Sequence, residues 1–119
     1  MALNFYDQSG SPIAYSEDGI HIYLFTGQPA AYLSGNTVYA FSGAHIGWFE
    51  DGWIRDTRGG CAFFSESAKG GPVKPVKHVK PVKGVKHVKP VKGVRAVKSV
   101  KAVKSLSWSP LSGVQFFHS

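Results

Sequence analysis

The chain of 119 residues has one cysteine, Cys61, and one methionine. A single cysteine excludes a disulfide framework within the chain and is typical of a reducing compartment. No stretch reaches the roughly 20 apolar residues that a membrane-spanning helix needs. The N-terminus also lacks a basic region followed by an apolar run, so we expect no signal peptide. These absences predict a cytoplasmic protein.

Acidic residues are missing from the second part of the chain. All seven precede residue 69, whereas twelve of the fourteen basic residues lie between Lys69 and Lys104. With Arg55 and Arg58 counted, the first part carries a net charge of −5 and the second +12. The overall charge of +7 would normally suggest an anionic partner. Here the two opposite regions could also neutralise each other.

What the sequence does contain is an eleven-residue pattern written four times, at 5–15, 22–32, 38–48 and 54–64. Each copy is centred on a glycine (Gly10, Gly27, Gly43 or Gly59), and these glycines are 17, 16 and 16 residues apart. The first half of each copy is β-branched or aromatic, which favours a strand. The glycine can supply the positive φ of a tight turn. The pattern therefore predicts four consecutive β-hairpins.

The second half of each copy ends on an aromatic residue, and the position before it is small in three copies: Ala14, Ala31 and Gly47. Because side chains alternate faces along a strand, these small residues share one face. A crowded symmetry axis would require such a column, which Phe63 interrupts in the last copy. A lone hairpin is marginal in water, so the four are expected to share one core.

Several further motifs follow in order. They are Ile22-Tyr23, Gly27-x-Pro29-x-Ala31-Tyr32, Val38-Tyr39-x-Phe41-x-Gly43-x-His45-Ile46-Gly47-Trp48, Gly52-Trp53-Ile54-Arg55-Asp56, Gly70-Gly71-Pro72, Trp108-Ser109 and Phe116-Phe117. With these motifs the chain resembles the four-petalled β-flower family over nearly its whole length. The resemblance implies an all-β fold, with hairpin petals in a pseudo-four-fold shallow barrel. It implies no reaction and no catalytic residue. The tail departs from the family pattern at Gly93, Ala96, Ser99 and Ala102, where proline and leucine would be expected.

The basic tail is itself a repeat, x-Val-Lys, from Val73 to Lys104, with Arg95 once in place of lysine. Pro75, Pro81 and Pro90 oppose a helix. Polyproline II has three residues per turn, so it would place valine, lysine and the variable residue on three straight edges. We expect an extended polyproline-like rod. A solvated low-complexity linker is the simpler alternative.

Apolar sequence returns after the tail. Ser109-Pro110 resembles an N-cap and first helical residue, so a short helix is expected over 110–117. Its aromatic residues are expected to dock on the hairpins, which would anchor both ends of the rod with its valines facing inward. The chain then divides into a hairpin domain (1–68), a tail (69–105) and a docking segment (106–119).

Two groups of residues are candidates for binding. Trp48 and Trp53 with Arg55 could stack a ligand ring, although core packing explains large aromatics equally well. The second group is the basic edge of the tail, which could bind an anionic polymer or a membrane surface. It comprises Lys74, Lys77, Lys80, Lys83, Lys86, Lys89, Lys92 and Arg95.

Catalytic signals are weak. The sequence has neither of the glycine-rich phosphate motifs. His45 and Cys61 occupy equivalent repeat positions, but Pro12 and Pro29 fill the same slot elsewhere, which indicates packing rather than a metal site or a nucleophile. The Glu-Asp pairs at 17–18 and 50–51 lie in turn sequences. We therefore predict no enzyme, no metal and no cofactor.

Two kinds of function fit these observations. In the first, the tail is a structural strap over the acidic petals, and any ligand or partner binds at the petal axis. In the second, the tail is a free polycation that binds nucleic acid or an anionic membrane. A homo-oligomer is compatible with both, and no small-molecule substrate is identifiable.

Overall fold

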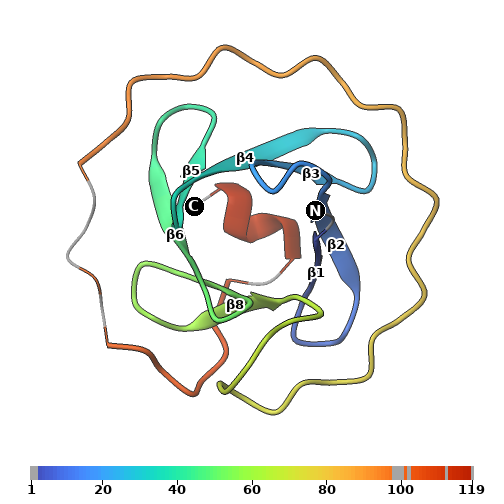
Figure 1. Cartoon of the computed structure of the whole chain (residues 1–119), viewed down its shortest axis with the longest axis vertical. Coiled ribbons are helices and arrows are strands. Elements are labelled where there is room, and N and C mark those ends of the chain that lie inside the picture. Colours follow the sequence, from blue (N-terminus) through green and yellow to red (C-terminus); the bar gives the residue numbers. More distant parts are fainter. Residues whose placement is uncertain (1–2, 98–100, 102, 112, 119) are drawn as a thin grey trace.

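The computed structural model describes residues 3–97, 101, 103–111 and 113–118. Eight antiparallel strands form one closed barrel in which every strand pairs with its neighbours in the sequence and β1 closes on β8 (Figure 1). The strands are β1 (Leu3–Tyr6), β2 (Pro12–Ser16), β3 (His21–Leu24), β4 (Pro29–Ser34), β5 (Thr37–Ala40), β6 (His45–Glu50), β7 (Trp53–Arg55) and β8 (Cys61–Phe64). The all-β fold and the four sequential hairpins are confirmed. We call the hairpins petals 1 to 4.

Each petal has the same internal irregularity. The register of every hairpin shifts once, after Phe5, Ile22, Val38 and Ile54 respectively. A bulge bends a strand and increases its twist, so four equivalent bulges help eight short strands to close. The central glycine of each petal has a positive φ, between +85° and +99°. The predicted role of glycine in the turns is therefore confirmed.

The barrel interior is filled rather than hollow. Its fully buried side chains alternate small and large around the axis: Phe5, Ala14, Ile22, Ala31, Val38, Ile54 and Phe63. Gly47 completes the small column, because a Cβ there would lie 2.1 Å from the carbonyl oxygen of Arg55. Phe63 takes the space that the three small residues leave, which explains why it interrupts the column.

The C-terminal segment returns to the barrel. Trp108 forms an isolated parallel bridge with Cys61 at the edge of β8, and the chain continues into a 3-10 helix, η1 (Gly113–His118), which lies over the centre of the barrel (Figure 1). Phe116 is fully buried, with its ring 5.5 Å from Phe63 and nearly perpendicular to it. Docking of the aromatic residues is confirmed. The helix expected over 110–117 is shorter, starts at Gly113 and is 3-10 rather than α-helical.

Between these parts the tail surrounds the barrel as an extended ring without helix or strand among its described residues (Figure 1). We call the described residues of 73–105 the belt. The predicted inward direction of the valines is wrong. Ten belt valines are 84–95% exposed, because the belt backbone and the lysine side chains occupy the space against the petals. The valine edge faces solvent wherever the belt is described.

Candidate functional site: the interface between belt and petals

The belt is fixed to the petals at a spacing of nine residues. The backbone N–H groups of four belt residues each donate to the carbonyl oxygen of one petal glycine. The pairs are His78 to Gly10 (2.9 Å), His87 to Gly27 (2.9 Å), Ala96 to Gly43 (2.8 Å) and Ser105 to Gly59 (3.2 Å). Nine residues are three polyproline turns, so the same face of the belt returns at each petal.

Belt length matches the size of the barrel. A polyproline chain rises about 3.1 Å per residue, so nine residues span about 28 Å and four such units about 112 Å. The molecule measures 36 × 35 Å across its wide face. A circle of that diameter has a circumference of about 110 Å, which is close to the length of the four polyproline units. The triplet repeat therefore supplies one quarter of the circumference per petal.

Glycine is required at the petal tips for a second reason. A Cβ added at Gly27 would lie 2.0 Å from the carbonyl oxygen of Val85, and one added at Gly43 would lie 1.9 Å from that of Val94. Both distances are far below any van der Waals contact. The belt has glycines facing the other way, since a Cβ at Gly93 would lie 2.1 Å from the carbonyl oxygen of Ser42. Backbone thus packs directly on backbone.

Aromatic pairs mark three junctions between neighbouring petals, and a belt cation lies over each pair. The stacked pairs are Tyr6–Phe64, Tyr15–Tyr23 and Tyr32–Tyr39. The cations nearest to them are Lys77 over Tyr6 (5.7 Å to the ring centroid), Lys83 over Tyr15 (4.4 Å), Lys86 over Tyr23 (5.1 Å), Lys92 over Tyr32 (4.4 Å) and Arg95 over Tyr39 (5.1 Å). Each cation is attracted by the negative face of its ring, so the lysine edge of the belt is held inward.

Carboxylates add ion pairs at two junctions. Glu17 pairs with Lys83 and Lys86, and Glu50 with Lys101 and Lys104. Hydrogen bonds from Lys86 and Lys83 lower the pKa of Glu17. Burial alone would raise the pKa of Glu50, but Lys101 and Lys104 hold it below its ordinary value. Exposed pairs contribute little singly, so these charges act as a set that orients the belt.

The fourth junction, between petals 3 and 4, uses a different residue. Arg55 stands where the other petals have Tyr6, Tyr23 or Tyr39. Its Nη1 donates to the carbonyl oxygens of Gly59 (2.7 Å) and Ser105 (2.8 Å). A buried arginine with two carbonyl acceptors joins the petal tip to the end of the belt.

The residues predicted to bind a ligand are therefore structural neighbours of the belt. Trp48, Trp53 and Arg55 are all buried. Trp53 donates through Nε1 to the carbonyl oxygen of Lys69 at 3.0 Å and packs edge-on against Trp108. The structure brings Trp53 and Arg55 to the two ends of the belt. Ligand binding at these three residues stays a prediction.

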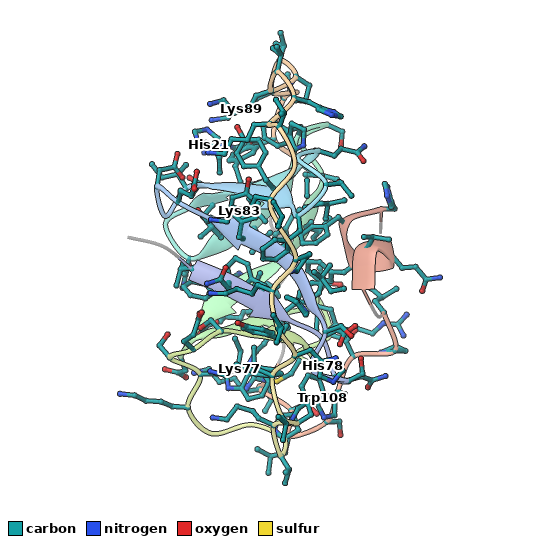
Figure 2. The ribbon with its side chains drawn as sticks, turned by 90° about the vertical axis from the view of Figure 1, so that its right-hand side faces the viewer. His21, Lys77, His78, Lys83, Lys89 and Trp108 are labelled. Atoms are coloured by element: carbon teal, nitrogen blue, oxygen red, sulfur yellow. The ribbon has the colours of Figure 1, made fainter. Side chains whose placement is uncertain are left out.

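The eight basic residues predicted to bind anions divide into two sets. Lys74, Lys77, Lys83, Lys86, Lys92 and Arg95 lie against aromatic rings. Lys80 and Lys89 have no partner among the residues that the structure describes. Figure 2 shows Lys89 at the outer edge of the molecule, and Lys77 and Lys83 along the belt. Anion binding by the set also stays a prediction.

The other sequence candidates have separate partners. His45 lies against the Trp48 ring and its Nε2 is 3.1 Å from the carbonyl oxygen of Gly47. Cys61 is buried in a different cluster, and burial raises its pKa, which disfavours a thiolate. Within the described part of the chain, no group of three or more His, Cys, Asp or Glu side chains could hold a metal ion.

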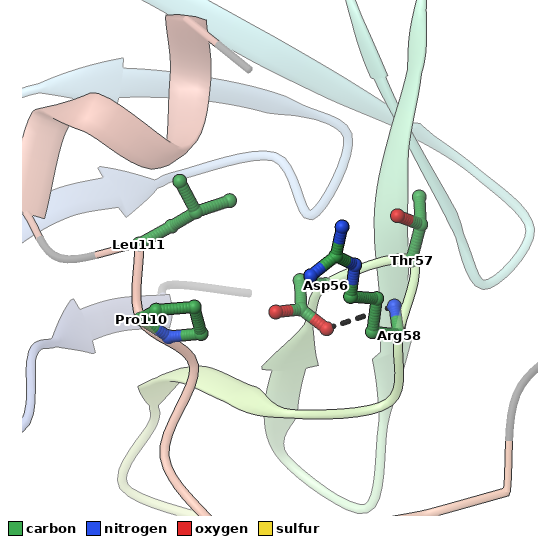
Figure 3. A pocket seen from close by; sticks show the side chains of 5 residues that line it. All are labelled: Asp56, Thr57, Arg58, Pro110 and Leu111. Atoms are coloured by element: carbon green, nitrogen blue, oxygen red, sulfur yellow. Dashed lines mark hydrogen bonds between the residues drawn. The ribbon is translucent and has the colours of Figure 1, made fainter.

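One hollow of about 270 Å³ lies between the tip of petal 4 and the C-terminal segment (Figure 3). It is lined by Asp56, Thr57, Arg58, Pro110 and Leu111. The Asp56 side chain is buried, and its oxygens accept hydrogen bonds from the backbone of Arg58 and Gly60 and from Ser109 Oγ. These bonds hold the turn and Ser109 in place, so Asp56 serves structure rather than chemistry here.

The sequence analysis did not predict the nine-residue spacing of the belt contacts, although the sequence contains a signal for it. Pro75, Gly84 and Gly93 are nine apart and lie where the belt is closest to the petals, and His78 and His87 repeat at the same interval. The valine triplet is so regular that it hides this longer period.

A closed antiparallel barrel of four petals, held by a belt, defines an all-β class of protein. Its family is shown by a family model described as 4-fold beta flower protein, which matches residues 3–117. The chain belongs to this family, whose description names a fold and no reaction. Neither a curated protein nor a solved structure is matched. No helix in the described residues is long and apolar enough to cross a bilayer.

The ion pairs predict acid sensitivity. The pKa values of Glu17, Glu50 and Asp51 are lowered in the folded protein. These carboxylates therefore stabilise the fold fully at any pH above their pKa values in the unfolded chain. The stabilisation is lost as the pH falls through their pKa values in the folded protein. We expect the melting temperature to fall below about pH 4.5. The fall should be shallower for Glu17→Gln, measured by circular dichroism from about pH 7 to 3; an identical pH profile would contradict this assignment.

Proposed function

We propose that this protein is a non-enzymatic structural and binding module, in which the belt is a strap that fixes the petals into one rigid disc. The observation that carries the proposal is the series of four belt-to-glycine hydrogen bonds at nine-residue intervals. A free polycationic tail would have no reason to keep this register. A cytoplasmic location is part of the proposal, because the lone Cys61 is unpaired.

The petal axis is a weaker candidate for binding than the belt. The Phe116 ring covers the axis at one end and packs on Phe63. The rim, in contrast, exposes ten valines, and monomeric proteins rarely expose so much apolar surface without an interaction partner. We therefore place partner binding at the outer edge of the belt.

Amide hydrogen exchange tests the strap. The N–H groups of His78, His87 and Ala96 are expected to exchange about tenfold more slowly than those of Val79, Val88 and Val97, for which the described residues offer no acceptor. Each hydrogen-bonded amide is compared with the amide of the next residue in the same extended segment, so the two differ mainly in whether the N–H has an acceptor. Equal, fast exchange at all six amides would show a free tail and overturn the proposal.

A further inference from the structure

One position of the petal repeat differs in petal 2. Two residues after the last aromatic, petals 1, 3 and 4 have Glu17, Glu50 and Glu66, whereas petal 2 has Ser34. Glu17 and Glu50 form ion pairs with belt cations. Burial would raise the pKa of Glu66, but hydrogen bonds from Asn4, together with the charge of Lys77, hold it below its ordinary value. Ser34 provides no charge at the equivalent junction.

The belt cations at this junction are consequently not neutralised. Lys92 and Arg95 lie over the Tyr32 and Tyr39 rings, and neither they nor Lys89 has a carboxylate partner in the described residues. The surrounding petals cannot supply one, because no acidic residue occurs between Gly19 and Phe49. This quarter of the disc therefore carries positive charge without any carboxylate, whereas each of the other three junctions has a glutamate.

The valine edge is also exposed along this arc. Val88, Val91 and Val94 are 94–95% exposed, and they alternate along the belt with Lys89, Lys92 and Arg95. The arc runs past β4 and β5 on the convex rim (Figure 1). We call residues 87–97 the docking arc. Apolar side chains pointing outward beside uncompensated cations form an amphipathic surface.

We propose that the docking arc binds an anionic lipid membrane, with the disc standing on its edge. The valines enter the boundary between headgroups and acyl chains, and the charge of the three cations behind them attracts the anionic headgroups. This inference deepens the proposed function, since it requires that the belt be docked on the petals. It assigns the partner of the valine rim and the quarter of the rim that binds.

Geometry favours a membrane over other partners. If two copies of the protein met rim to rim, their convex edges would touch over only a few valines. The area buried would be far smaller than the roughly 1,200 Å² that a stable protein interface buries. A deformable bilayer can follow the curve. Nucleic acid would be contacted by outward basic groups, but the groups that point outward here are valines.

Vesicle co-sedimentation of the full chain tests the proposal. The probes are phosphatidylcholine vesicles with and without phosphatidylglycerol. We expect binding only with phosphatidylglycerol. The variant Val88→Ser/Val91→Ser/Val94→Ser should lose about tenfold or more in partition coefficient. The matched control Val76→Ser/Val79→Ser/Val82→Ser changes similarly exposed valines on an arc whose junctions carry Glu66 and Glu17, and it should change the coefficient less than about twofold.

A charge variant tests the same arc independently. Ser34→Glu supplies the missing carboxylate and should weaken partition about fivefold, the value of one basic contact at an anionic leaflet, with Ser34→Gln as the neutral control. Slow exchange of the Ala96 amide in each variant shows that the strap is intact, so loss of docking is separable from loss of the belt.

Several results would overturn the inference. They are equal binding to neutral vesicles, equal losses in the two valine variants, no effect of Ser34→Glu, and a dimer in sedimentation equilibrium that disappears with the docking-arc valines. Binding to duplex DNA that survives the docking-arc valine changes, with no vesicle binding, would assign the cations to nucleic acid instead.

Discussion

Replacing Gly43 with alanine is expected to loosen the belt and to destabilise the protein by about 3 kcal/mol, from strain at positive φ and from a direct clash. The new Cβ would lie 1.9 Å from the Val94 carbonyl oxygen, at a φ of +99°. Neither backbone can move without breaking the hydrogen bond from Ala96 to Gly43. Urea unfolding and exchange of the Ala96 amide would measure both consequences.

Gly35→Ala is the matched control for this change. Gly35 also has a positive φ, +63°, but nothing lies within 4 Å of the position of its Cβ. It should cost only about 1 kcal/mol, which is the conformational penalty alone, and should leave the Ala96 amide protected. If both variants lost the same stability and Ala96 stayed protected in both, close packing of the belt on the petal tips would be refuted.

Phe116→Ala should be equally damaging. The Phe116 ring is fully buried between Phe63 and Phe117 and lies against the backbone at Gly47. Its removal leaves a cavity over the barrel axis that the short 3-10 helix cannot fill, so we expect a loss of about 3–5 kcal/mol.

Val114→Ala, on the same helix, is the control. Because Val114 is 45% exposed, this substitution should lower the free energy of unfolding by well under about 1 kcal/mol. Both variants can be compared by urea unfolding at one pH. A Phe116→Ala protein as stable as Val114→Ala would show that the C-terminal segment does not complete the core.

The hairpins were predictable because their signals are local. A glycine that needs positive φ, such as Gly27, and a small residue facing a crowded axis, such as Ala31, each follow from one strand or turn. The resemblance to the β-flower family then supplied the arrangement of the petals. The four bulges were not predicted, since nothing in a pair such as Ile22-Tyr23 distinguishes a bulged strand from a regular one.

The direction of the belt valines could not be read from hydrophobicity. Burying valine is favourable in general, but the belt backbone approaches the petals so closely at Gly84 and Gly93 that no branched side chain fits there. Lysine fits better beside this contact, because its long stem lets the ammonium group reach over a tyrosine ring. The tail thus lies against the petals, but with its lysine and valine edges reversed from the predicted orientation.

The nine-residue register couples two parts of the chain that the repeat alone would leave independent. Hairpin number and belt length cannot change separately: a barrel with a fifth hairpin would need about nine more belt residues. Loss of one triplet from the present chain would leave the belt about 9 Å too short. Any duplication of a hairpin in this family therefore has to be matched by three further triplets, and an insertion that is not a whole number of triplets would place a valine where only glycine or proline meets the petal.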